Sequence, residues 1–171
     1  MILGMSTATF TLVHVLLSLA GIASGFVVLA GLLTGKRRDR STALFLATTA
    51  LTSLTGFGFP FDHLLPSHKI GILSLLVLTV AIAARYGLHL VGIWRSMYVV
   101  SAMIALYFNV FVAFVQAFLK VPSLRALAPT QSEPPFLATQ LVVLVAFIVL
   151  GIFAVKRFRT EPVRAAAAAA K

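Results

Sequence analysis

Four histidines are the side chains of this sequence best suited to bind a small ligand or a metal. His63 and His68 lie together in the polar stretch 55–69, TGFGFPFDHLLPSHK, between two apolar runs. His14 lies in the first apolar run and His89 in a later polar window. Neutral imidazole is an axial ligand of b-type haem and a hydrogen-bonding group for polar ligand atoms. These residues therefore predict a haem b or quinone site with a redox role.

Spacing decides which histidines can act together. A continuous helix would separate His68 and His89 by about 31 Å, so these two cannot share one iron. His14 with His68 is the preferred pair, because their estimated depths in a membrane differ by less than the width of a haem. His63 is the substitute for His68.

A divalent metal is the alternative ligand for this group. Asp62, His63, His68 and His14 offer ligand types that suit zinc or copper, but the spacing matches no familiar zinc pattern. The chain has no cysteine, which excludes disulfides, thiolate-bound zinc and iron–sulfur clusters. It also has only four acidic residues and none of the common nucleotide-binding, hydrolase or metalloprotease motifs, which argues against an enzyme.

Composition identifies the elements that must position these residues. The chain has 171 residues, of which 60% are hydrophobic and 11% charged, whereas soluble domains carry about 25% charged residues. Apolar runs of bilayer-spanning length, about 20 residues, recur along it. The fold class predicted is therefore all-α, a polytopic membrane helical bundle with the lipid bilayer as its partner.

Five transmembrane spans follow from the breaks between the apolar runs. One helix over 69–119 would be about 77 Å long, against a hydrocarbon core of about 30 Å, so the chain must turn in the polar window 85–96. Ser41 or Thr42 is expected to cap the second span. The transmembrane domain is predicted over 1–159, followed by a low-complexity cytoplasmic tail over 160–171. The spans expected are 9–33, 42–57, 70–91, 98–119 and 136–155.

Positive charge predicts the orientation. With five spans, one side of the membrane receives eleven of the fourteen lysines and arginines, and the other side receives only Lys69, Lys120 and Arg125. The positive-inside rule places the N-terminus outside and the C-terminus in the cytoplasm. The basic residues cluster at the ends of apolar runs, which argues against nucleic acid as a partner. Asp39 is expected to pair with its local basic neighbours, and Arg85 to extend to the headgroups.

Small and polar residues on the spans predict how the helices pack. Gly21 and Gly25, four residues apart, form a seam of the kind that lets membrane helices approach closely. The strongest hydrogen-bonding groups inside the spans are expected in the outer half, beneath the stretch 55–69, which would form a lid. The predicted cofactor-binding residues are His14, His63, His68, Asn109, Gln116 and Gln140.

Two other functions fit the same sequence. The aromatic stretch 55–69 and the proline-rich loop 120–135 would suit an accessory or assembly subunit that docks a membrane-protein partner or a second copy of itself. Small-solute transport is the third reading, but no inverted repeat supports it.

Three short segments carry a family resemblance: Pro66-Ser-His-Lys-Ile-Gly71, Trp94-Arg95 and Tyr107-Phe-Asn109. They resemble small uncharacterised bacterial multi-pass membrane proteins, some of which are similar in outline to b-type cytochrome membrane domains. The resemblance implies a multi-pass protein of the bacterial cytoplasmic (inner) membrane, with His68 as the residue to test.

Overall fold

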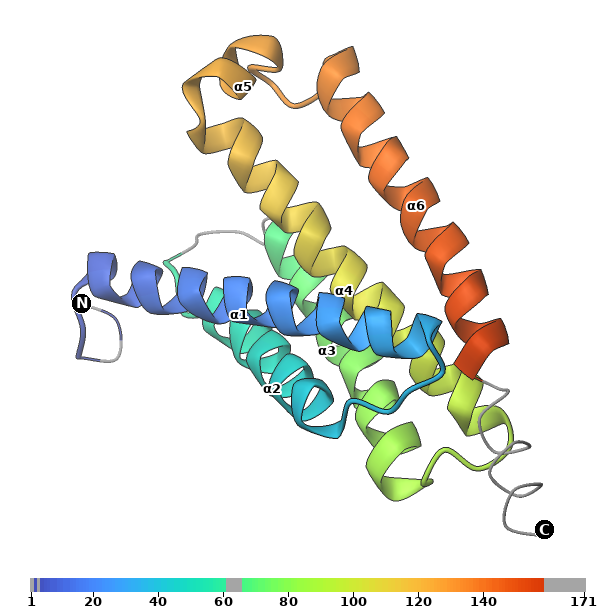
Figure 1. The fold of residues 1–171 in the computed structure, drawn as a ribbon. Coiled ribbons are helices and arrows are strands. Elements are labelled where there is room, and N and C mark those ends of the chain that lie inside the picture. Colours follow the sequence, from blue (N-terminus) through green and yellow to red (C-terminus); the bar gives the residue numbers. More distant parts are fainter. Residues whose placement is uncertain (1, 3, 61–65, 159–171) are drawn as a thin grey trace, which may run out of the picture.

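The computed structural model describes residues 2, 4–60 and 66–158 of the chain, and these residues fold into helices. Asp62, His63 and the tail 160–171 lie outside the described residues. Figure 1 shows the arrangement of the helices. They are α1 (Thr7–Leu33), α2 (Asp39–Gly56), α3 (Pro66–Ile82), the π-helix η1 (Ala83–Gly87), α4 (Ile93–Lys120), α5 (Pro122–Leu127) and α6 (Pro134–Phe158).

Four of these helices are long and apolar enough to cross a membrane: α1, α3 together with η1, α4 and α6. Helix α2, over which a span at 42–57 was predicted, is not among them, because its threonines and the charged residues at its start make it less apolar than the others. The described part of the chain is thus all-helical, with four candidate membrane-spanning helices.

The start of α2 differs from the prediction. The helix begins at Asp39, whose carboxylate at the N-terminus is favourable for the helix dipole, and Arg38 takes the N-cap position without a side-chain hydrogen bond. The expected cap at Ser41 or Thr42 is therefore wrong. Thr42 is instead buried, with its Oγ1 3.3 Å from the hydroxyl of Tyr98 on α4.

The chain turns back between α3 and α4 within the polar window that the sequence indicated. The predicted third span extends too far, to residue 91, because α3 ends at Ile82 and continues only as the π-helix η1. His89, Leu90 and Gly92 then adopt positive φ angles of 50°, 60° and 56°. This left-handed backbone ends the helix and lets α4 begin at Ile93.

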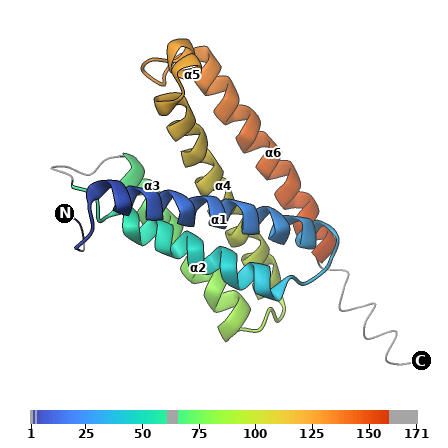
Figure 2. The same cartoon turned by 60° about the vertical axis from the view of Figure 1, so that its left-hand side comes forward.

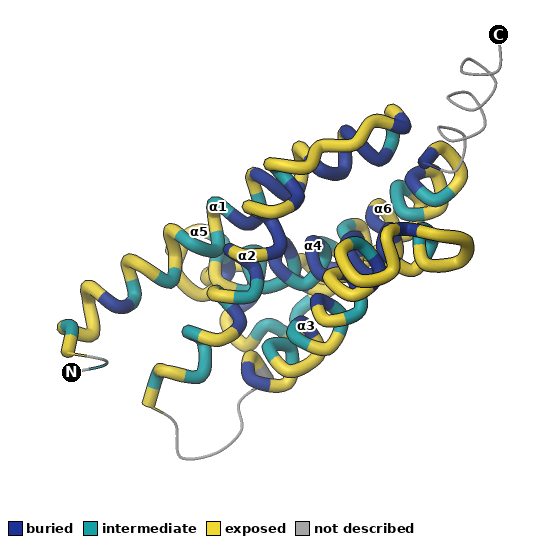
Figure 3. Tube along the Cα trace, turned by 90° about the horizontal axis from the view of Figure 1, so that it is seen from below, coloured by how far each residue is buried: buried dark blue, intermediate teal, exposed yellow. Residues whose placement is uncertain are grey.

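Helix α4 is the centre of the bundle. It packs against α1, α3 and α6, and half of its most apolar window is buried, against 17% for that of α6. The main core gathers on it from α1, α2 and α3, with Leu29, Phe45, Leu78, Tyr98 and Leu106 among its members. Figures 2 and 3 show α6 at the edge of the bundle, with an exposed outer face.

The predicted glycine seam in α1 packs within the chain. A β-carbon at Gly25 would lie 2.5 Å from Cδ1 of Leu106 and 3.0 Å from the ring of Phe45. One at Gly21 would lie 3.2 Å from Oγ1 of Thr49 and 3.3 Å from Nδ2 of Asn109. Both glycines therefore let α1 approach α2 and α4 closely.

One end of the bundle collects many of the basic residues. Arg85 forms an ion pair with Asp39, and the guanidinium of Arg157 donates to the carbonyl of Leu33 at 3.3 Å. The guanidinium of Arg95 lies 6.0 Å from the ring centroid of Phe158. These contacts join the C-terminal ends of α1, η1 and α6 to the N-terminal ends of α2 and α4.

Two expectations about charge are wrong. Asp39 pairs with Arg85, 46 positions away, and not with its local basic neighbours. Arg85 does not extend to the headgroups, because its side chain is only 8% exposed and its guanidinium lies 5.1 Å from the ring centroid of Tyr98. A carboxylate and an aromatic face thus hold this cation inside the protein.

Candidate functional site

A cavity of about 590 Å³ lies at the opposite end of the bundle, between the N-terminal half of α1, the corner that joins α2 to α3, and the C-terminal half of α4. Its walls carry apolar side chains from α1 and α4, such as Leu19, Ile22 and Val112. Polar groups line it as well: Thr11, His14, Ser18, Ser67, His68, Gln116 and Lys120.

His14 is held in one tautomer by its neighbour on α2. Its Nδ1 lies 2.8 Å from Oγ1 of Thr55, and that hydroxyl donates its proton to the carbonyl of Leu51 at 2.7 Å. A hydroxyl that donates to Leu51 accepts from His14, and in that arrangement Nδ1 carries the hydrogen. In the neutral ring Nε2 is then a bare acceptor, available to a ligand.

Aromatic rings pack against the two histidines of this cavity. Phe59 lies edge-on to the ring of His14, at a centroid distance of 5.3 Å, and edge-on to Phe10 at 5.1 Å. His68 is only 4% exposed and stacks on Phe57, with centroids 5.4 Å apart. The structure therefore brings His14 and His68 to one cavity, with His68 packed tightly against the protein.

A smaller cavity of about 90 Å³ adjoins the first and shares His14, Ser18 and Ser67 with it. Asn109 lines this inner cavity, where its amide donates to Oγ1 of Thr49 at 3.0 Å. Ser53 donates to Ser74 at 3.1 Å on the same side. The two cavities thus adjoin each other, and the inner one carries the larger share of polar lining residues.

The two predicted glutamines have different places. Gln116 lines the large cavity on α4. Gln140 lines neither cavity: its amide donates to the carbonyl of Phe111 at 3.3 Å, between α6 and α4, and its buried Oε1 has no partner among the described residues. It therefore lies outside the two cavities, against α4.

A metal centre has no support in the described part of the chain, where no group of three histidine, cysteine or acidic side chains comes together. His63 and Asp62, proposed from the sequence as ligands, lie outside the described residues. The described cavity instead combines an acceptor nitrogen on His14 with donors on Gln116 and Lys120. This arrangement suits a mainly apolar molecule with hydrogen-bonding oxygens.

Sequence reasoning missed Thr55 and Lys120. Thr55 begins the polar stretch 55–69, but nothing in the spacing identifies it as the partner of a histidine 41 positions away. Lys120 ends a long apolar helix, and the sequence analysis used it only as a charge for orientation.

Comparison with known protein families, curated protein sequences and solved structures finds no match for this chain.

Proposed function

We propose that this chain is a five-span protein of a bacterial cytoplasmic membrane that binds a quinone-class molecule in the cavity beside His14. The N-terminus lies outside and the C-terminus in the cytoplasm, so the cavity belongs to the outer half of the membrane.

Contacts at the basic end support five crossings. The ion pair between Arg85 and Asp39 joins the end of η1 to the start of α2, which follows α1 directly. The chain must therefore return to the far end between Leu33 and the start of α3, and α2 is the segment that does so. Its hydroxyls suit an apolar setting, because Thr48, Thr52 and Thr55 each donate to a backbone carbonyl four residues earlier.

The orientation follows from the charge at the two ends. The chain lacks cysteine, so single cysteines report topology without interference. In intact cells, an impermeant maleimide should label Ser123→Cys, in α5, and should label Arg37→Cys only after the cells are opened. Labelling of both in intact cells, or of Arg37→Cys alone, would overturn the proposed threading.

The observation that carries the ligand assignment is the place of His14, whose Nδ1 is bound by Thr55 and whose Nε2 is left for a ligand in a largely apolar cavity. A quinol hydroxyl can donate to this nitrogen, while the amide of Gln116 and the ammonium of Lys120 can donate to a quinone oxygen. The apolar walls, which include Val15, Leu19 and Ile22, suit an isoprenoid chain. A hydrophobic molecule with oxygens on a flat ring matches both features.

Haem b is the second candidate, because His14 and His68 line the same cavity. The proton of His14 on Nδ1 also suits iron ligation through Nε2. The quinone is preferred because His68 is already stacked on Phe57 and almost fully buried, whereas a bis-histidine haem needs both rings to face the iron.

One purification separates the two candidates. The protein is extracted in mild detergent, its visible spectrum is recorded, and its organic extract is analysed by mass spectrometry for quinones. We expect a quinone retained by the wild type and lost from His14→Leu, with no Soret band. A Soret band that disappears in the same variant would establish the haem instead, and neither signal in the wild type would contradict both candidates.

A further inference from the structure

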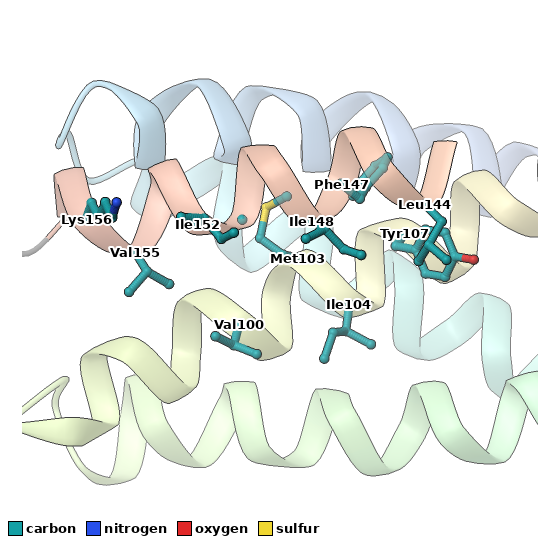
Figure 4. Close-up of a pocket in the computed structure, with 11 residues that line it drawn as sticks. Val100, Met103, Ile104, Tyr107, Leu144, Phe147, Ile148, Ile152, Val155 and Lys156 are labelled. Carbon is teal, nitrogen blue, oxygen red and sulfur yellow. The ribbon is translucent and has the colours of Figure 1, made fainter. Parts of the chain in front are cut away.

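A second cavity, of about 540 Å³, lies between α4 and α6, away from the site beside His14. Figure 4 shows the two helices with their side chains directed to it. Val100 and Ile104 line it from α4, and Ile148 and Ile152 line it from α6. Lys156 is the one charged residue among its lining, in the last turn of α6.

This groove opens to the surroundings of the bundle. Ile148 is 52% exposed, Ile152 50% and Val100 45%, so side chains on both helices face outward. Both α4 and α6 are candidate membrane spans, and the surroundings of such apolar walls are lipid chains. The groove is therefore open to the membrane and not to water.

Its length matches one leaflet. Leu144 and Lys156 line its two ends on α6, and twelve helical steps span about 18 Å, close to half of a hydrocarbon core of about 30 Å. A packed partner helix would need a seam of small residues, whereas Gly151 is the single glycine of this groove and its neighbours are large and branched. The shape thus favours an acyl chain over a helix.

Charge identifies the headgroup. Lys156 is exposed and has no carboxylate partner among the described residues, where the acids are Asp39, paired with Arg85, and Glu133, at the other end of α6. Arg157 adds a second cation beside it at the basic end of the bundle. An anionic phosphate is the group that this end of the groove attracts.

We propose that the groove between α4 and α6 is a specific site for one anionic phospholipid. An acyl chain lies along Ile104, Ile148 and Gly151, and the phosphate binds Lys156. The site is independent of the ligand beside His14 and requires only that α4 and α6 lie in the membrane.

Gly151 allows the groove to be filled without disturbing the helices. A β-carbon there would have Met103 as its nearest neighbour, at 4.0 Å from Cγ, which is an ordinary contact. Gly151→Leu would therefore extend into the groove and displace a lipid chain. Val149→Leu, on α6 but outside the groove, is the matched control, and Arg37→Gln is the control for loss of positive charge.

Native mass spectrometry of the protein in detergent measures the site directly, with phosphatidylglycerol or phosphatidylcholine of identical acyl chains added. We expect one phosphatidylglycerol to be retained at least fivefold more than phosphatidylcholine. Lys156→Gln should lower its retention about fivefold, the effect of about 1 kcal/mol per basic residue near an anionic surface. Gly151→Leu should abolish it, while both controls keep the wild-type level.

Equal retention of the two lipids would overturn the assignment of the phosphate to Lys156. Unchanged retention in Gly151→Leu, with an unfolding temperature equal to that of the wild type, would overturn the groove itself. Because Lys156→Gln is an exposed substitution, it provides a test even if the leucine variant folds poorly.

Discussion

The imidazole of His14 on α1 and the hydroxyl of Thr55 on α2 are hydrogen-bonded at 2.8 Å, and the hydroxyl also donates a hydrogen bond to the carbonyl of Leu51. The bond fixes the orientation of the ring. It also ties the first helix to the end of the second, beside the large cavity that His14 lines. The acceptor nitrogen of the proposed site depends on this pair.

Replacement of Thr55 by valine tests the pair. The variant keeps the shape of the side chain but leaves Nδ1 of His14 without an acceptor, so the ring can rotate or change tautomer. Loss of a group that orients a ligand-binding histidine typically costs tenfold or more in affinity, and we expect quinone-analogue affinity to fall by about tenfold. Titration with a short-chain quinol in detergent measures the change.

Thr55→Ser is the control for this substitution, because it retains the hydroxyl and should bind within about twofold of the wild type. If valine and serine variants bind equally well, the orientation of His14 does not matter for the ligand.

Close packing at Gly25 gives a prediction for stability. An alanine there would place its β-carbon 2.5 Å from Cδ1 of Leu106 and 3.0 Å from the ring of Phe45, so these side chains or α1 itself would have to move. Overpacking of this kind costs about 1–3 kcal/mol. Gly25→Ala should therefore lower the unfolding temperature in detergent clearly, while Gly87→Ala, with no atom within 4 Å of the new β-carbon, should leave it nearly unchanged. Equal unfolding temperatures for the two variants would mean that α1 does not pack as described.

Much of the fold could be predicted from the sequence, because long apolar runs and the breaks between them depend on local composition. The turn before α4 was located by its polar residues, and the glycine seam of α1 by its spacing. The partners of side chains could not be predicted in this way. Arg85 meets Asp39 only because η1 ends beside the start of α2, and Gln140 binds the carbonyl of Phe111 and lines neither cavity because of the way α6 packs on α4.

In the candidate site, too, positions along the helices could be predicted and side-chain partners could not. His14 and Gln116 were placed at similar depths from their positions in the spans, and they do line one cavity. Depth along a helix does not give rotation about its axis. For that reason Thr55, which completes the site, was found only when α1 and α2 were seen packed together.

The ion pair between Arg85 and Asp39 predicts a coupled loss of stability. Asp39→Asn removes the charge opposite a guanidinium whose side chain is 8% exposed, while the aspartate itself is 75% exposed and partly screened. We therefore expect a loss of about 1–2 kcal/mol, below the value for a fully buried pair. The double variant Asp39→Asn with Arg85→Met should recover part of it. If the loss of stability in the double variant equals the sum of the losses in the two single variants, the ion pair contributes nothing to stability.

The carboxylate of Glu133 lies outside the membrane, in the turn before α6, and should make the stability of this turn depend on pH. Desolvation is the largest single contribution and raises its pKa, but hydrogen bonds from the backbone and side chain of Thr130 and the backbone of Ser132 together outweigh it, so the pKa lies below its ordinary value of 4.5. A lowered pKa in the folded state means that the turn is stabilised above pH 4.5 and loses this support as the pH falls through the folded pKa.

The amide resonance of Thr130, followed by NMR against pH, should therefore shift with a midpoint below 4.5. The shift should be absent in Glu133→Gln. A midpoint above 4.5, or the same titration in the glutamine variant, would contradict this role of the carboxylate.

The central claim is that a quinone-class molecule binds through Nε2 of His14, and the binding of a short-chain quinol to purified protein tests it most directly. Loss of one hydrogen bond corresponds to about 1–1.5 kcal/mol, so His14→Leu should weaken binding about tenfold. His89→Asn, at the other end of the bundle, should bind within about twofold of the wild type. Equal binding by wild type and His14→Leu, or no binding by either, would contradict the account.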